Sequence, residues 1–355
     1  MSEKNVCEVR YFAACNSYRG FVSFYDDVFS GLKRLYIIKG GPGTGKSRLM
    51  RDVASDALDR GYRVELYYCS SDPDSLDGLI LPELSVGMLD GTAPHVCDPS
   101  FPGVRDEIIN LGSFWNEDIL LSHREEIEGL ITQKSRKYVQ CYHYLSAVEK
   151  VNAACRRLIE DAVSQEKLHA AVLRLLRGLK NGDGAKKRYG LRSAISMRGS
   201  VTLPTYGQIA QDHIVIRDRF DTADLFLQAV LREVEKREQA CIISPTPLNP
   251  ARLDAIYIPA LDLSVSVGDA RQSGDGLINM ERFLSADVLR RNRAKLRFGR
   301  RCAASLAEGA EQELSEIGDL HFSLEKIYTE AMDFGKKEAY TAELITHIQS
   351  QLSQA

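Results

Sequence analysis

The sequence predicts a duplicated α/β fold in which each copy has a parallel sheet followed by a helical extension, and in which the second copy is degenerate. Three observations lead to this prediction. Short apolar runs alternate with helix-like periodicity in residues 1–113, a glycine-rich loop follows the first of these runs, and segments of the first half recur in the second half. Alternating strands and helices are typical of α/β folds with a parallel sheet.

The first expected strands are three apolar runs bounded by turn residues, at 34–39, 64–69 and 86–90. Such runs are typical of buried parallel strands. Between the first two, apolar side chains recur at helical spacing over residues 48–58, which predicts a strand–helix–strand crossover. Residues 114–180 contain few Gly or Pro and have helical periodicity, so we expect them to form the helical extension.

The two halves of the chain share several segments in the same order, which indicates a duplicated unit. The matches pair Asp72-Pro73 with Asn249-Pro250, Leu76-Asp77 with Leu253-Asp254, Arg19-Gly20 with Arg198-Gly199, and Phe114, Asp118 and Leu120 with Phe283, Asp287 and Leu289. The polar, Gly-rich stretch 180–185 is typical of a linker. The predicted domains are therefore residues 1–183, with an α/β core at 1–113 and a helical part at 114–180, and residues 184–355.

The loop after the first strand matches the phosphate-binding pattern G-x-x-x-x-G-K-[ST] with Gly40, Gly41, Pro42, Gly43, Thr44, Gly45, Lys46 and Ser47. Its glycines let the backbone curl so that successive N–H groups surround phosphate oxygens, and the following helix adds its positive end. We expect Lys46 to contact the β- and γ-phosphates, Ser47 to ligate Mg²⁺, and Arg48 to extend the nucleotide-binding segment. The pattern predicts a P-loop NTPase-type domain that uses ATP and Mg²⁺.

A second Mg²⁺ ligand is expected at the end of a neighbouring strand, where Asp90 closes the run 86–90. The alternative is that Asp90 caps the turn that follows it. Gly91 stands where many ATPases carry a catalytic glutamate, so the candidates for a water-orienting residue lie nearby, at Asp72 or Asp74, Thr92 and His95. Asp72 follows the second strand at the ligand-binding edge of the sheet, or else it caps a turn.

The second copy has lost the phosphate loop. Alignment of residues 214–216 with 36–38 places Asp224 on Lys46 and Leu225 on Ser47, and it removes the glycines. Carboxylates at these positions repel phosphate, so we expect this copy to be structural or regulatory. Candidates for an arginine finger are Arg19, Arg105 and Arg198.

Composition limits the other classes of function. The net charge is −3, no apolar run approaches the roughly 18 residues of a membrane span, and the first residues lack the apolar core of a signal peptide. The eight cysteines form no C-x-x-C pair, so no disulfide framework or zinc site is indicated. A basic stretch at 288–301 precedes an acidic one at 308–316, and we expect two helices that pair or stay solvated. We therefore expect a cytoplasmic protein without a nucleic-acid or membrane partner.

Several stretches resemble an uncharacterised family of bacterial tandem P-loop ATPase-like proteins. They are the loop 40–47 and the segments 69–78, 82–84, 90–95 and 108–112, and the similarity extends over nearly the whole chain. The resemblance implies the duplicated fold and the use of ATP, and it adds weight to Asp72, Asp77, Asp90 and His95 as site residues. Both halves can bear a P-loop in that family, whereas the second half of this chain has none.

These observations predict Mg-dependent binding of ATP and its hydrolysis by the first half, which signals through the second half or a protein partner. One alternative is a small-molecule kinase, in which the turn at 72–77 activates a substrate hydroxyl. The other is a nucleotide-gated switch or scaffold with little turnover, which the absence of a glutamate after Asp90 favours.

Overall fold

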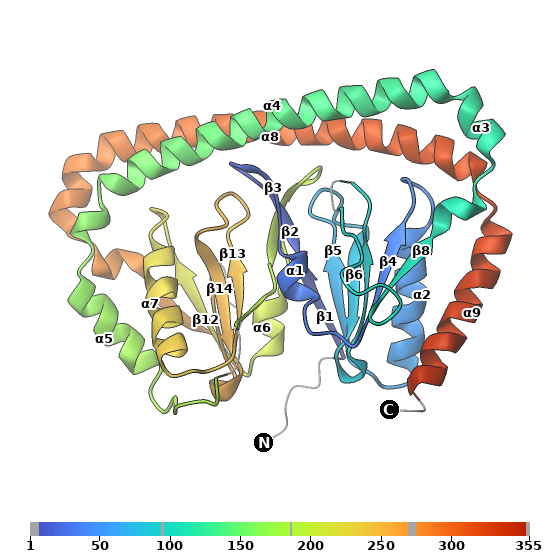
Figure 1. Ribbon diagram of the computed structural model, residues 1–355. Helices are drawn as coiled ribbons and strands as arrows, with labels where there is room; N and C mark the ends of the chain where they lie inside the picture. The colour runs from blue at the N-terminus through green and yellow to red at the C-terminus, as the bar shows by residue number, and fades with distance from the viewer. Residues whose placement is uncertain (1–6, 94–95, 185–186, 269–274, 353–355) are drawn as a thin grey trace.

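The computed structural model describes residues 7–93, 96–184, 187–268 and 275–352. Two α/β units lie side by side, and a pair of long helices spans both of them (Figure 1). The first unit carries the glycine-rich loop, and the second unit repeats its architecture strand for strand. The expected duplicated α/β fold is therefore observed.

Each unit contains one six-stranded sheet, and the strand order is the same in both. The first sheet has the order β1–β5–β6–β7–β4–β8, with the bounds Glu8–Phe12, Val64–Tyr68, Leu76–Leu81, Val86–Asp90, Arg34–Lys39 and Asp106–Asn110. The second has the corresponding order β9–β13–β14–β15–β12–β16, with the bounds Lys187–Tyr189, Cys241–Pro245, Leu253–Ile258, Leu263–Val267, Asp212–Arg217 and Gly276–Asn279.

The sheets are mixed, so the prediction of a purely parallel sheet is wrong. Strand β6 runs antiparallel to both β5 and β7, whereas β4 is parallel to β7 and β8. The short 3-10 helix η1 (Pro82–Leu84) joins β6 to β7. A connection this short permits only antiparallel pairing, because parallel neighbours need a crossover of a dozen or more residues. Strand β14 is likewise antiparallel to β13 and β15.

Helix α2 (Lys46–Asp59) packs on the first sheet through the apolar face that its sequence period predicts, with Leu49, Met50 and Val53 in the core. Its counterpart α7 (Ala223–Lys236) packs on the second sheet.

Each unit also has a short hairpin, β2–β3 (Ala14–Ser17, Gly20–Ser23) in the first and β10–β11 (Ser193–Ser196, Gly199–Thr202) in the second. The remaining short helices are α1 (Tyr25–Val28), α6 (Thr205–Ile209), η2 (Leu111–Phe114), η3 (Glu160–Ala162), η4 (Pro259–Leu261) and η5 (Met280–Phe283).

Corresponding residues of the two units meet where the units touch. Phe12 and Leu191 exchange two backbone hydrogen bonds, of 2.7 and 3.0 Å. Nearby, the N–H of Tyr18 donates to the carbonyl of Leu248, and the N–H of Met197 donates to the carbonyl of Ser71, both at 3.0 Å. Reciprocal contacts between equivalent positions are the mark of a two-fold arrangement. The units are therefore related by an approximate two-fold axis within one chain.

The helical extensions cross over between the units. Helix α3 (Glu117–Ser122) leads into α4 (Arg124–Arg157), which runs antiparallel to α8 (Ala286–Ala331) across the top of both sheets (Figure 1). After α4 ends, α5 (Gln165–Leu175) of the first half packs into the core of the second unit, where its Leu168 and Val172 are buried. In return, α9 (Phe334–Leu352) of the second half packs into the first unit. Each sheet is therefore covered in part by a helix from the other half.

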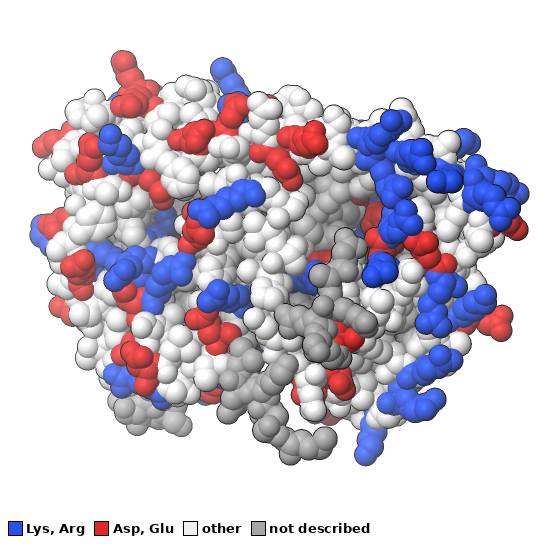
Figure 2. Space-filling view, turned by 180° about the vertical axis from the view of Figure 1, so that it is seen from behind, with Lys and Arg blue, Asp and Glu red and all other residues white. Residues whose placement is uncertain are grey.

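The basic and acidic stretches lie on one continuous helix, so the expectation of two neighbouring helices is wrong. The exposed basic residues occupy the start of α8, and Lys and Arg gather on that side of the molecule in Figure 2. The acidic stretch lies further along α8, where Glu313 and Glu316 pair with Lys137 of α4. In the part of the chain that the structure describes, no helix is both long and apolar enough to cross a membrane.

Candidate functional site

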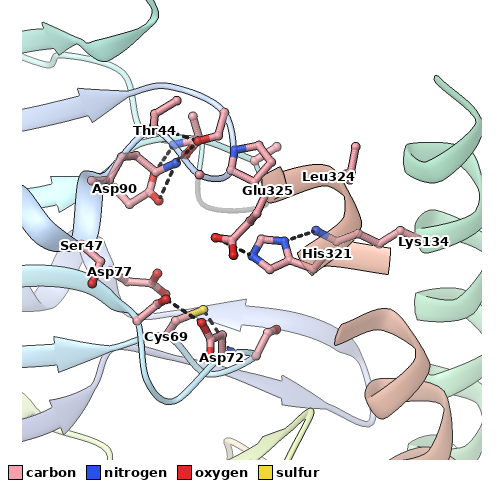
Figure 3. Close-up of a pocket in the computed structure, with 18 of the residues that line it drawn as sticks. Thr44, Ser47, Cys69, Asp72, Asp77, Asp90, Lys134, His321, Leu324 and Glu325 are labelled. Atoms are coloured by element: carbon pink, nitrogen blue, oxygen red, sulfur yellow. Dashed lines mark hydrogen bonds and ion pairs between the residues drawn. The ribbon is translucent and has the colours of Figure 1, made fainter. Parts of the chain in front are cut away.

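A cavity of about 820 Å³ lies between the first α/β unit and the long helix pair (Figure 3). One wall is formed by the loop 40–47 and by residues that follow β5 and β7. The opposite wall is formed by α4 and α8, and Met197 of the second hairpin also reaches the cavity. The second half of the chain therefore contributes directly to the site that the first half was predicted to hold.

The loop 40–47 joins β4 to α2, as expected of a phosphate-binding loop. Gly43 and Gly45 have φ values of 71° and 80°, in the left-handed region that favours glycine. Thr44 is buried, and its hydroxyl donates to the carbonyl of Gly41 at 2.9 Å, which stabilises the curl of the loop. Gly45 is the N-cap of α2, whose first N–H groups have no partner within the helix. This is the local structure that binds anions at helix N-termini.

Lys46 lies between the loop and the end of β7. Its Nζ donates to the carbonyls of Gly40 and Gly41 at 2.9 and 2.7 Å, and it lies 3.5 Å from Oδ2 of Asp90. Asp90 is 9% exposed, and it accepts the N–H of Thr92 at 2.9 Å and the Thr92 hydroxyl. Asp90 therefore caps the turn that follows it, as the alternative interpretation predicts, and it also lies beside the loop lysine, while its role as a Mg²⁺ ligand stays a prediction.

The side chains of Ser47 and Arg48, the second and third residues of α2, lie on different sides of the helix. The hydroxyl of Ser47 lines the cavity and accepts the N–H of Leu76 at 3.0 Å, which ties the helix start to β6. The side chain of Arg48 is 76% exposed and pairs with Asp52 at 2.9 Å. Arg48 does not line the cavity, so the site as the structure forms it ends at Ser47.

The acidic turn after β5 also borders the cavity. Asp72 is 7% exposed and accepts the Ser75 hydroxyl at 2.5 Å and the N–H of Asp74 at 3.3 Å, so it caps the turn as the simpler interpretation predicts. Asp77 is 4% exposed and accepts the hydroxyl of Tyr25 at 3.1 Å. Both carboxylates line the cavity on the side of β5.

The remaining candidates contribute less. His95 lies outside the described residues. Arg105 pairs with Asp106 at 2.5 Å, and Arg198 pairs with Asp74. The guanidinium of Arg19 packs over the ring of Tyr18 at 5.1 Å. None of these three arginines lines the cavity, so the structure does not support any of them as an arginine finger.

Three polar residues of the long helices face the loop, and sequence reasoning missed all of them. Nζ of Lys134 lies 3.2 Å from Nδ1 of His321, and Nε2 of His321 lies 3.5 Å from Oε1 of Glu325 (Figure 3). The pKa of Glu325 is lowered, first by its hydrogen bond with His321 and also by the Gly43 N–H and by Lys46. Helix periodicity places these residues on a face of α4 or α8, but it carries no signal that this face meets the loop.

Helix α8 packs directly on the glycines of the loop. A Cβ on Gly41 would lie 2.8 Å from the ring of Tyr328, and a Cβ on Gly43 would lie 2.5 Å from the backbone oxygen of Glu325. The hydroxyl of Thr329 also donates to the carbonyl of Gly43, at 3.4 Å. Glycine is therefore required here for close approach of a helix as well as for backbone conformation.

The corresponding place in the second unit is filled by its own side chains. Asp218 accepts the N–H groups of Phe220 at 3.0 Å and Thr222 at 2.5 Å, and that of Ala223 at the start of α7. Burial raises the pKa of Asp218, and these N–H donors oppose that shift. The carboxylate lies at the helix N-terminus, the position that the sequence predicts for an anion in the first unit.

The structure shifts the alignment of the two loops by one residue. Helices α2 and α7 begin at Lys46 and Ala223, so Ala223 and not Asp224 corresponds to the loop lysine. Asp224 accepts the N–H of Leu253 at 2.8 Å, as Ser47 accepts that of Leu76. The sequence alignment missed this because the second loop is shorter. The loss of the lysine and of the glycines is unchanged.

Comparison with protein families, with curated proteins and with solved structures found no match to this chain. The resemblance to tandem P-loop ATPase-like proteins therefore remains a prediction. Among the described residues, no group of three or more His, Cys, Asp or Glu side chains could hold a metal ion by itself.

Proposed function

We propose that this chain binds ATP with Mg²⁺ at the loop 40–47 and hydrolyses it, and that the second half acts as a structural or regulatory partner. The observation that carries the proposal is the position of Lys46, between the loop carbonyls and Asp90 at the end of β7. An ammonium held at the mouth of a glycine loop, at the N-terminus of a 14-residue helix, is suited to bind phosphate oxygens.

The residues at the loop fit a magnesium ion that binds together with a nucleotide. Mg²⁺ usually takes one or two protein oxygens, with water and phosphate oxygens completing the shell. Ser47, next to Lys46 in the chain, supplies a hydroxyl, and Asp90, 3.5 Å from Nζ of Lys46, supplies a carboxylate. Bound there, the ion would neutralise phosphate charge.

Side chains of this protein would position the phosphates and the attacking water. Lys46 would hold the terminal phosphates, and the carboxylates of Asp72 and Asp77 would accept a hydrogen bond from water on the β5 side of the cavity. Asp90 has Gly91 beside it, so no glutamate stands at the next position. Turnover by the chain alone would therefore be slow, and a partner or substrate would accelerate it.

One observation favours transfer to a small molecule as a second candidate. The cavity is also lined by Phe21, Tyr138, Tyr142 and Met197. Tyr138 and Tyr142 stack with ring centroids 5.9 Å apart, and Tyr138 donates to Ser71 at 3.2 Å. Hydrolysis does not need an aromatic chamber beside the phosphate site, whereas an acceptor molecule does.

The deciding experiment compares wild type, Lys46→Ala and Arg48→Ala, and it scores bound nucleotide and released phosphate separately. Arg48 is the matched control, because it is a neighbouring basic residue whose side chain points away from the cavity. We expect Lys46→Ala to lose both binding and turnover, and Arg48→Ala to keep both. A wild-type protein that binds no nucleotide contradicts the proposal. Binding without phosphate release supports the kinase or the switch instead.

A further inference from the structure

Lys134 of α4 is the second cation that faces the cavity. Lys46 and Lys134 are the only Lys or Arg residues among the described residues that line it. They belong to opposite walls, because Lys46 is part of the loop segment and Lys134 lies on α4, where Figure 3 shows it beside His321. Two ammonium groups on facing walls attract an anion between them, in a cavity that the carboxylates of Asp72, Asp77, Asp90 and Glu325 also line.

Among the described residues, Lys134 makes no direct ion pair. No described carboxylate lies within ion-pair distance of its Nζ, and its hydrogen-bond partner is Nδ1 of His321 at 3.2 Å. Lys137, one turn further along α4, is different, because it pairs with both Glu313 and Glu316. A half-buried cation without a direct ion pair is costly, so an anionic group beside it is expected when the site is filled.

The groups around Lys134 shift its pKa in both directions. Burial lowers the pKa of Lys134, and repulsion from Lys46 lowers it further, while Cys69 and Glu325 oppose the shift. Cys69 follows β5, beside the turn that carries Asp72. Lys134 lines the same cavity as Cys69 and the candidate carboxylates Asp72 and Asp77.

We propose that Lys134 contacts the terminal phosphate of the bound nucleotide and makes the site prefer a triphosphate to a diphosphate. This inference rests on the proposed function of the loop. A loop of this kind encloses the β-phosphate with its backbone, so the γ-phosphate is the group that extends toward the opposite wall. A diphosphate lacks the group that Lys134 would reach. His321 is a positioning residue, because its contacts with Lys134 and Glu325 place the ammonium on this side of α4.

The test measures the dissociation constants of ATP and ADP with Mg²⁺ for wild type, Lys134→Met, Lys134→Arg and the control Lys137→Met. We expect Lys134→Met to weaken ATP binding about tenfold, as loss of a charge-assisted contact does, and to leave ADP binding nearly unchanged. Lys134→Arg should restore much of the preference for ATP. Lys137→Met should bind both nucleotides like wild type, because Lys137 does not line the cavity. Thermal melting of each variant shows whether it is folded.

Two results overturn the inference while the proposed function stands. They are an equal loss of ATP and ADP affinity in Lys134→Met, and an unchanged affinity for both. If the wild type binds neither nucleotide, the proposed function itself fails, and the two failures are thus distinguished.

Discussion

The indole of Trp115 packs against the ring of Tyr328, with centroids 5.4 Å apart, and Tyr328 in turn covers Gly41 of the glycine loop. Trp115 is the only tryptophan of the chain. Its emission therefore reports on the contact between α8 and the loop without interference from other indoles.

We expect ATP with Mg²⁺ to change the intensity or wavelength of this emission, because a nucleotide in the loop lies beside the glycine that Tyr328 covers. A fluorescence titration measures the change, and Lys46→Ala should abolish it. Calorimetric binding without any change in emission would show that the contact of α8 with the loop is insensitive to nucleotide.

Gly43→Ala is expected to destabilise the protein by more than a change of backbone conformation alone. Gly43 has a φ of 71°, which costs a non-glycine residue about 1–2 kcal/mol. A Cβ there would also lie 2.5 Å from the oxygen of Glu325, so α8 must shift. Gly61→Ala is the control, because Gly61 has a φ of 83° but no atom within 4 Å of the added Cβ. Urea unfolding measures both variants, and equal losses would contradict the role of the helix contact.

Asp218→Ala should destabilise the second unit without affecting the proposed nucleotide site. The carboxylate accepts the N–H groups of two residues in the loop before α7 and of Ala223, the first residue of α7, and loss of an N-terminal cap costs about 1–2 kcal/mol. Asp183→Ala is a suitable control, since Asp183 is exposed in the linker. We expect a lower urea midpoint for Asp218→Ala only. The prediction fails if the two variants unfold alike.

Acid should remove the stabilisation that Asp106 gives to the segment before β8. Asp106 is 2% exposed and accepts from Arg105 and from the N–H groups of Ser100 and Phe101, both at 2.7 Å. These donors, with Arg105 first, lower its pKa below the ordinary value of 3.8. Its stabilisation is therefore complete above pH 3.8 and is lost as the pH falls through the lowered pKa.

The variant Asp106→Asn should lose about 2 kcal/mol near neutral pH and lose less than wild type on acidification. Unfolding in urea at several pH values measures both effects. Asp98→Asn provides the control, because the Asp98 side chain is 80% exposed. Parallel pH profiles for wild type and Asp106→Asn would contradict this account.

Local pattern was sufficient for the elements around the loop. The predicted strands at 34–39 and 86–90 are β4 and β7. The helix expected between the predicted strands at 34–39 and 64–69 is α2. Each of these depends on residues close in sequence, namely an apolar run, a helical period and glycines at left-handed positions. The duplication was also readable, because equivalent turns keep equivalent residues such as Asp77 and Asp254.

The sequence by itself determined the duplicated α/β architecture, the form of the glycine loop and the loss of its lysine in the second copy. Only the tertiary structure decided that β6 runs antiparallel, that α5 and α9 exchange units, and that Lys134, His321 and Glu325 complete the cavity. Helix period fixes which residues share a face, but the partner of that face depends on packing between residues far apart in the chain.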